Sequence, residues 1–208
     1  MAGLEGQAAE REVPRWDPLV RLTHWGIAAA VLLNGLITEE GGQVHVWIGY
    51  AAFAMLALRL VWGAIGTGPA RFSAFPPSLS AARAHVADIL SGRRRTHRSH
   101  NPLGALMAYA LWGTLAVVTV TGIAMAGSPF APRAGDDVRH ERVAVAGDHG
   151  EEDDEHEGAE DEAGETLEEV HEAAANLLLL LAALHVGGVA LESRVSGRNL
   201  MRPMVKGS

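Results

Sequence analysis

The chain has 208 residues and a mass of 22.0 kDa, a size that suits a single domain. It contains no cysteine, which excludes disulfides, thiolate metal sites, cysteine-bound iron–sulfur clusters and covalent haem attachment through cysteine. The net charge of −8 is uneven, because residues 128–170 carry 16 acidic and 3 basic side chains while the remainder carries a net +5, which argues against a uniformly solvated globular protein.

Four long apolar stretches follow one another along the chain, at residues 18–37, 44–63, 103–126 and 171–191. Each has about 20 residues or slightly more, the length that a helix needs to cross roughly 30 Å of hydrocarbon. A soluble four-helix bundle is the alternative, but it needs a polar face on every helix, and residues 106–126 offer none. The sequence therefore predicts an all-α fold, an antiparallel four-helix membrane bundle that forms one domain over residues 1–208.

The distribution of arginine and lysine sets the expected orientation. These residues gather before the first stretch, between the second and third stretches, and after the fourth, whereas only Arg133, Arg139 and Arg142 lie between the third and fourth. Basic loops face the cytoplasm, so both termini are expected on the cytoplasmic side of a bacterial inner (plasma) membrane. The acidic segment between the third and fourth helices then faces outward.

Two connecting segments have distinctive compositions. Residues 77–92 mix apolar and charged positions in a pattern typical of a short amphipathic helix at a membrane surface. Residues 136–164 are very acidic and of low complexity, so they are expected to form a largely disordered outer loop. The negative field of this loop is expected to attract a cationic partner; the alternative is a solvated spacer with no part in transfer.

Four of the ten histidines lie in or at the ends of the apolar stretches. An ionisable side chain in a membrane helix is a functional candidate, although a single one is also explained as a core residue bonded to a backbone carbonyl. His171 and His185 are 14 residues apart, so they face the same way on one helix, about 21 Å apart. Depth in the membrane pairs His24 with His185 near the cytoplasm and His45 with His171 near the outside. Two facing imidazoles across a bundle can supply both axial positions of a haem iron.

Several motifs resemble those of the bacterial cytochrome b561 family and of the b-type cytochrome subunits of nickel–iron hydrogenases: WDPLVRLTHW, HVWIGY followed by LRLVWG, HNPLGA, and HEAAANLLLLLAALHVGGV. The resemblance covers about residues 14–128 and 167–206. It implies an electron-transport protein with two non-covalent b-type haems, whose irons take their axial ligands from the first, second and fourth helices. By position, those ligands are His24, His185, His45 and His171.

Further polar residues are candidates for contacts with the inner haem. His100 matches a family position and is expected either to hydrogen-bond a haem propionate or to cap the start of the third helix. Arg59 lies at the inner level, where it is expected to pair with a propionate or to snorkel toward water. His85 is expected to be solvated. His149 and His156, among carboxylates, are expected to stay solvated rather than to bind a divalent cation.

The resemblance implies an electron conduit in membrane lipid, with quinone and an outer redox protein, such as a c-type cytochrome or a hydrogenase-like enzyme, as partners. No nucleic-acid partner is expected. The alternative is a self-contained oxidoreductase, either a quinone-linked superoxide oxidase or a ferric reductase, and the negative outer segment counts against the superoxide anion. A zinc transporter is a third class, but transport sites usually use buried carboxylates near the midplane, where these stretches have none.

Overall fold

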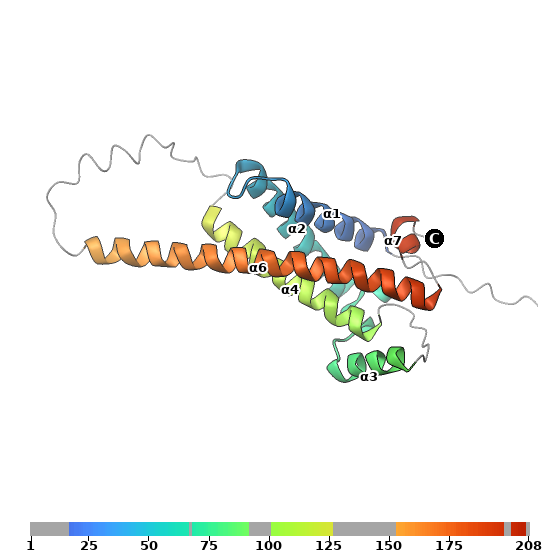
Figure 1. The fold of residues 1–208 in the computed structure, drawn as a ribbon. Coiled ribbons are helices and arrows are strands. Elements are labelled where there is room, and N and C mark those ends of the chain that lie inside the picture. The colour runs from blue at the N-terminus through green and yellow to red at the C-terminus, as the bar shows by residue number, and fades with distance from the viewer. Residues whose placement is uncertain (1–16, 67, 92–100, 127–152, 198–200, 207–208) are drawn as a thin grey trace, which may run out of the picture.

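Four long helices dominate the computed structural model, which describes residues 17–66, 68–91, 101–126, 153–197 and 201–206 (Figure 1). They are α1 (Pro18–Leu36), α2 (Gln43–Ile65), α4 (Pro102–Ala126) and α6 (Asp153–Ser196). All four are long and apolar enough to cross a membrane. The predicted all-α, four-helix membrane architecture is therefore confirmed.

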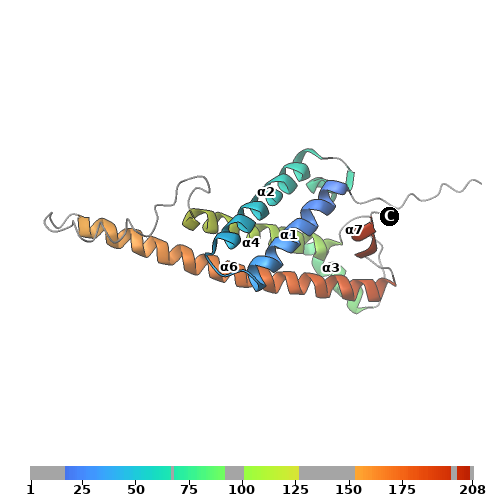
Figure 2. The same ribbon diagram turned by 90° about the horizontal axis from the view of Figure 1, so that it is seen from above.

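Successive long helices run antiparallel, and each packs against the next. Helix α1 packs on α2, α2 on α4, and α4 on α6, while α1 meets α6 along only a short stretch (Figures 1 and 2). Leu56, Leu115 and Leu178 form the buried core, one residue from each of α2, α4 and α6. Most of the other apolar side chains of these helices point outward, as expected of helices whose solvent is lipid.

Local chemistry defines the ends of α1. Asp17 caps its N-terminus, because the Asp17 carboxylate accepts hydrogen bonds from the backbone N–H groups of Leu19 (2.8 Å) and Val20 (3.4 Å). Pro18 occupies the first turn, where a missing N–H costs nothing. The turn into α2 contains Gly41 with a φ of 68°, a left-handed conformation that glycine adopts without strain. The short turn keeps α1 and α2 adjacent and antiparallel.

Helix α6 is longer than the sequence predicted, at 44 residues. It runs well past the ends of the other helices (Figure 2). The expectation of disorder over 136–164 is therefore wrong from 153 onward, and residues 136–152 lie outside the described residues. Glutamate is the commonest residue at 153–164 and favours helix, and the membrane helix already supplies the nucleus onto which further turns add.

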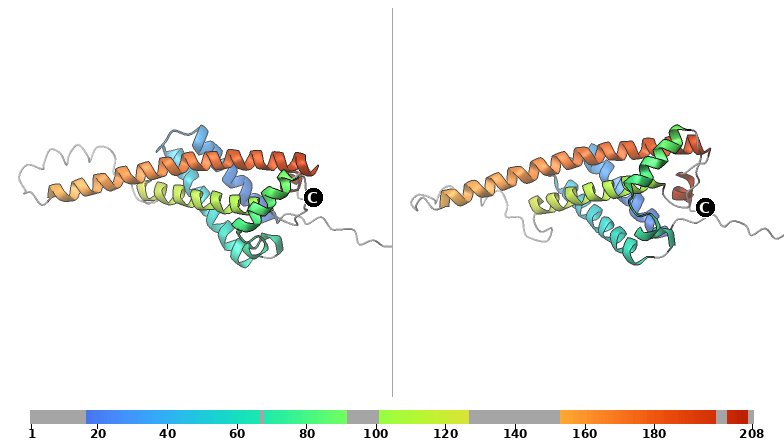
Figure 3. Two further views of the ribbon diagram at one scale, coloured as in Figure 1. Left: turned by 60° about the horizontal axis from the view of Figure 1, so that its bottom comes forward. Right: turned by 90° about the horizontal axis from the view of Figure 1, so that it is seen from below.

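Shorter elements cover the end of the bundle at which α4 begins. Helix α3 (Leu79–Leu90) packs against α4, and two 3-10 turns, η1 (Gly68–Ala70) and η2 (Phe72–Ala74), lead into it. Helix α7 (Met201–Lys206) lies at the same end (Figure 3). The helix expected within residues 77–92 is confirmed. However, His85 is buried on α3 rather than solvated, because the helix packs one face onto its neighbour.

Candidate functional site

The structure brings the four candidate histidines together as two pairs. The ring centroids of His24 and His185 are 6.3 Å apart with planes at 59°, and those of His45 and His171 are 6.3 Å apart with planes at 60°. Helix α6 contributes one member of each pair, and the other comes from α1 or α2. These are the pairs that depth along the helices predicted.

An apolar layer separates the two pairs. Leu178 stands midway between His171 and His185 on α6 and packs against Leu56 and Leu115. At about 1.5 Å per residue, the two histidines of α6 lie about 21 Å apart along the helix. The pairs are therefore two distinct sites, one near each end of the bundle.

Hydroxyl groups hold both imidazoles of the His45–His171 pair. His45 Nδ1 lies 3.1 Å from Thr38 Oγ1, and His171 Nδ1 lies 3.0 Å from Thr121 Oγ1. Next to Thr121, a Cβ on Gly122 would stand only 3.0 Å from His171 Cε1, so glycine leaves room for the ring. Sequence reasoning missed these three residues. Threonine in or next to a membrane helix commonly bonds the backbone of its own helix, so nothing in the sequence distinguishes Thr121 on α4, or Thr38 just after α1, from other threonines.

The His24–His185 pair has a different environment. The His24 ring meets the Trp25 ring edge-on, with centroids 5.3 Å apart. Among the described residues, neither His24 nor His185 has a hydrogen-bond partner on its ring. The turn of α1 around His24 also anchors α7, since Arg21 Nε and Trp25 Nε1 donate to the backbone carbonyl of Met204 over 3.1 Å and 3.2 Å. The C-terminal helix is thus tied to the helix that carries His24.

Arg59 is buried near the end of α2 that faces η1 and η2, with 4% of its surface exposed. Its Nη2 donates to the carbonyl of Ala70 over 3.4 Å, and its Cζ lies 4.8 Å from the centroid of the Trp112 ring. Its Nη1 is buried without a hydrogen-bond partner in the part of the chain that the structure describes. Because the guanidinium is buried, it does not reach toward water as a snorkelling side chain would. The Nη1 group can donate a hydrogen bond to an anion.

Other candidates lie outside these sites. His100 and His149 are outside the described residues, and nothing is described of the side chain of His156. Within the described ranges, no three or more side chains of the His, Asp or Glu type gather to hold a metal ion. The histidine pairs therefore offer two protein ligands each.

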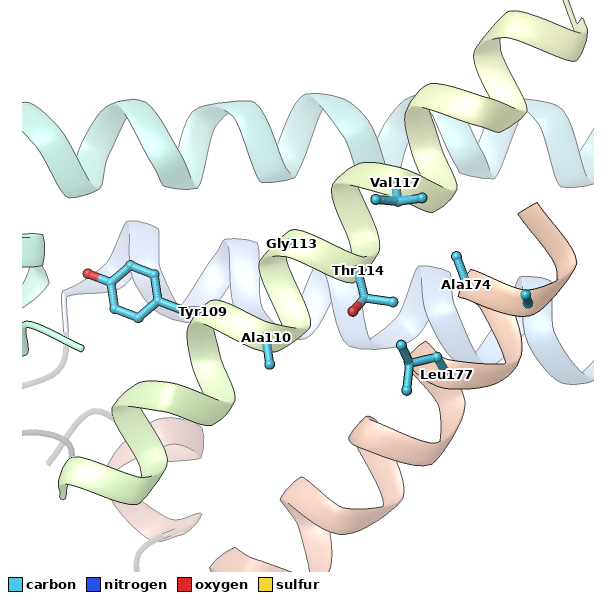
Figure 4. Close-up of a pocket in the computed structure, with 8 residues that line it drawn as sticks. Tyr109, Ala110, Gly113, Thr114, Val117, Ala174 and Leu177 are labelled. Carbon is cyan, nitrogen blue, oxygen red and sulfur yellow. The ribbon is translucent and has the colours of Figure 1, made fainter. Parts of the chain in front are cut away.

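A shallow apolar groove of about 480 Å³ runs between α4 and α6 (Figure 4). The groove exists because small side chains face each other on the two helices. None of the four paired histidines lines it. Its lining residues are Tyr109, Ala110, Gly113, Thr114, Val117, Ala173, Ala174 and Leu177. The groove is thus separate from the histidine sites.

Comparison with known families gives a match over most of the chain. The family described as prokaryotic cytochrome b561 matches residues 15–207, a range that includes all four long helices and both histidine pairs. Comparison with curated proteins and with solved structures found no match. The chain therefore belongs to the prokaryotic cytochrome b561 family and is a multi-pass inner-membrane b-type cytochrome that takes part in electron transfer.

Proposed function

We propose that the protein binds two non-covalent haems b and carries electrons across the membrane between an outer redox protein and quinone. The observation that carries this proposal is the spacing of the histidine rings. Two imidazoles that face each other across one metal atom, each with a metal–nitrogen bond of about 2.0 Å and a nitrogen about 1.1 Å from the ring centroid, have centroids about 6.2 Å apart. Both pairs measure 6.3 Å.

The donor set also suits haem better than an isolated ion. A structural zinc site needs four protein ligands, whereas each pair supplies two and no further ligand gathers there among the described residues. A porphyrin supplies the other four ligands itself. The limited contact between α1 and α6 is consistent with a flat group between these two helices.

When bound, the haems supply reversible one-electron chemistry. Within the chain, His24 and His185 would hold one iron and His45 and His171 the other. The apolar layer around Leu178 would keep water out between them. Holding the two sites at different depths gives electrons a route across the bilayer. Exposed glutamates on the outer part of α6 suit a cationic outer partner such as a basic c-type cytochrome.

Haem stoichiometry tests the proposal. A pyridine haemochrome assay on purified, haem-saturated protein is expected to give two haems b per chain, and acid–acetone is expected to extract both, because the chain has no cysteine for covalent attachment. A single haem would mean that one pair is not a ligand pair. Protein without Soret and α bands would refute the proposal.

The buried guanidinium of Arg59 is proposed to pair with a propionate of the inner haem. Replacing Arg59 with leucine is expected to lower the reduction potential of the inner haem, because removing a nearby positive charge favours the ferric state, and to leave the outer haem unchanged. Redox titration followed at the α band measures this. Arg71→Leu is the control, since Arg71 is exposed and water screens its charge. Unchanged potentials in Arg59→Leu would exclude the pairing.

The proposed orientation places residues 136–164 outside the cytoplasm. In sealed inverted membrane vesicles, a glutamate-specific protease added to the exposed cytoplasmic face is expected to leave this segment intact. The same protease is expected to cut it in vesicles opened with detergent, which serves as the control because the segment is rich in glutamate. Cleavage in sealed vesicles would reverse the topology.

A further inference from the structure

The hydroxyl of Thr121 has only one proton, and the backbone of α4 already takes it. Thr121 Oγ1 donates to the carbonyl of Val117 over 2.8 Å and lies 3.1 Å from that of Val118. The oxygen therefore faces His171 Nδ1, 3.0 Å away, with a lone pair. A hydrogen bond at this distance requires His171 Nδ1 to carry the hydrogen and donate it.

Thr38 places the same constraint on His45. Its hydroxyl donates to Asn34, whose side-chain and backbone oxygens lie 3.3 Å and 3.4 Å away, and it faces His45 Nδ1 at 3.1 Å. Asn34 in turn donates its amide to the backbone carbonyl of His45 over 3.0 Å. The start of α2 and the end of α1 are thus locked together around this ring. Because both Asn34 oxygens can only accept, this arrangement assigns the hydroxyl proton to Asn34 and the donor role to His45 Nδ1.

Both rings of the outer pair are thereby set in one tautomer, with Nδ1 protonated and Nε2 carrying the free lone pair. Neutral imidazole binds a metal through the nitrogen that has no hydrogen, and the partner of the other nitrogen decides which one that is. We propose that Thr38 and Thr121 are positioning residues that present Nε2 of His45 and His171 to the outer haem and lower its reduction potential. This inference rests on the proposed function.

The lowered potential follows from the direction of the two hydrogen bonds. An imidazole that donates from Nδ1 to an oxygen becomes a stronger electron donor through Nε2. A stronger axial donor stabilises ferric iron more than ferrous iron, which lowers the potential. Within the described residues the rings of His24 and His185 have no such partner, so the effect is confined to the outer site.

Valine substitution at either threonine is the direct test, because valine keeps the shape of threonine and removes the acceptor. Thr121→Val and Thr38→Val are expected to raise the reduction potential of the outer haem and to weaken its binding about 10- to 100-fold, with the inner haem unchanged. Thr121→Ser and Thr38→Ser are expected to restore both properties. Thr119→Val is the matched control, since Thr119 lies on the same helix as Thr121. Among the described residues its hydroxyl bonds only backbone, that of Leu115 at 2.8 Å and of Ala116 at 3.3 Å.

Two measurements keep this inference separate from haem binding itself. Redox titration of the loaded protein reads the potential, and ¹⁵N chemical shifts of His171 in the protein purified without haem read the tautomer. Wild-type protein is expected to show a protonated Nδ1, and Thr121→Val to lose that preference. The inference is overturned if the valine variants keep the wild-type potential and tautomer, or if Thr119→Val shifts them equally. Absence of haem from the wild-type protein would refute the proposed function and leave the tautomer measurement valid.

Discussion

His185→Ala is expected to reduce the haem content from two haems per chain to one, with the outer haem retained. The variant removes an axial ligand of the proposed inner haem and leaves His24 facing an empty position. The outer pair lies about 21 Å away along α6, beyond the buried Leu178, so its ligands are undisturbed. Haemochrome assays and redox titration measure the loss as the disappearance of one of two reduction steps.

The reciprocal variants serve as controls for this prediction. His24→Ala is expected to remove the same haem as His185→Ala, whereas His45→Ala and His171→Ala are expected to remove the other one. His85→Ala is the matched control for removing a buried imidazole outside the pairs, and it is expected to keep both haems. If His24→Ala and His185→Ala removed different haems from correctly folded protein, the pairing would be wrong.

Neutralising the outer glutamates of α6 is expected to slow electron exchange with a basic c-type cytochrome by about tenfold or more at low salt. Glu162, Glu165, Glu168 and Glu169 are all exposed. Their replacement by glutamine removes four charges and keeps a similar helix propensity, so the length of the helix is retained. Stopped-flow mixing at several ionic strengths measures the rate. The rate of the glutamine variant is also expected to depend less on salt than the wild-type rate, because exposed charges act through a field that salt screens beyond about 8 Å at physiological ionic strength.

A neutral small-molecule electron donor is the control for these glutamine variants. Its rate is expected to be unchanged, since it experiences no steering by the field. Deleting residues 148–162 provides a second comparison, because it shortens the helix as well as removing charge. If the variants exchange electrons with the basic cytochrome as fast as the wild type at low salt, the acidic segment is only a spacer.

Most of the architecture was predictable from the sequence because a membrane imposes simple rules. The lengths of the apolar stretches placed α1, α2 and α4 within about three residues of their observed ends. The pairing of the histidines followed from helix geometry, since an interval of 14 residues brings His171 and His185 to one face of α6. Neither inference requires knowledge of side-chain packing.

The features that escaped prediction depend on contacts between distant residues. Charge composition favoured disorder at 153–164, and the helix nucleus that α6 supplies from inside the membrane outweighed it. His85 is buried because α3 folds onto α4, which is a tertiary contact. The roles of Thr38 and Thr121 depend on the rotation of α1 and α4 relative to the histidines. Hydropathy and periodicity carry no information about that rotation.

The apolar layer between the two histidine pairs makes electron transfer between them sensitive to the membrane voltage. On the proposed function, an electron that moves between the two levels travels about 21 Å through a dry region, which is about two-thirds of a hydrocarbon core of roughly 30 Å. The membrane voltage therefore acts on this step with roughly 1.5 kcal/mol per 100 mV. Because the cytoplasm of a respiring cell is negative, the voltage opposes inward electron movement, and the flow from the outer partner slows as the membrane becomes energised.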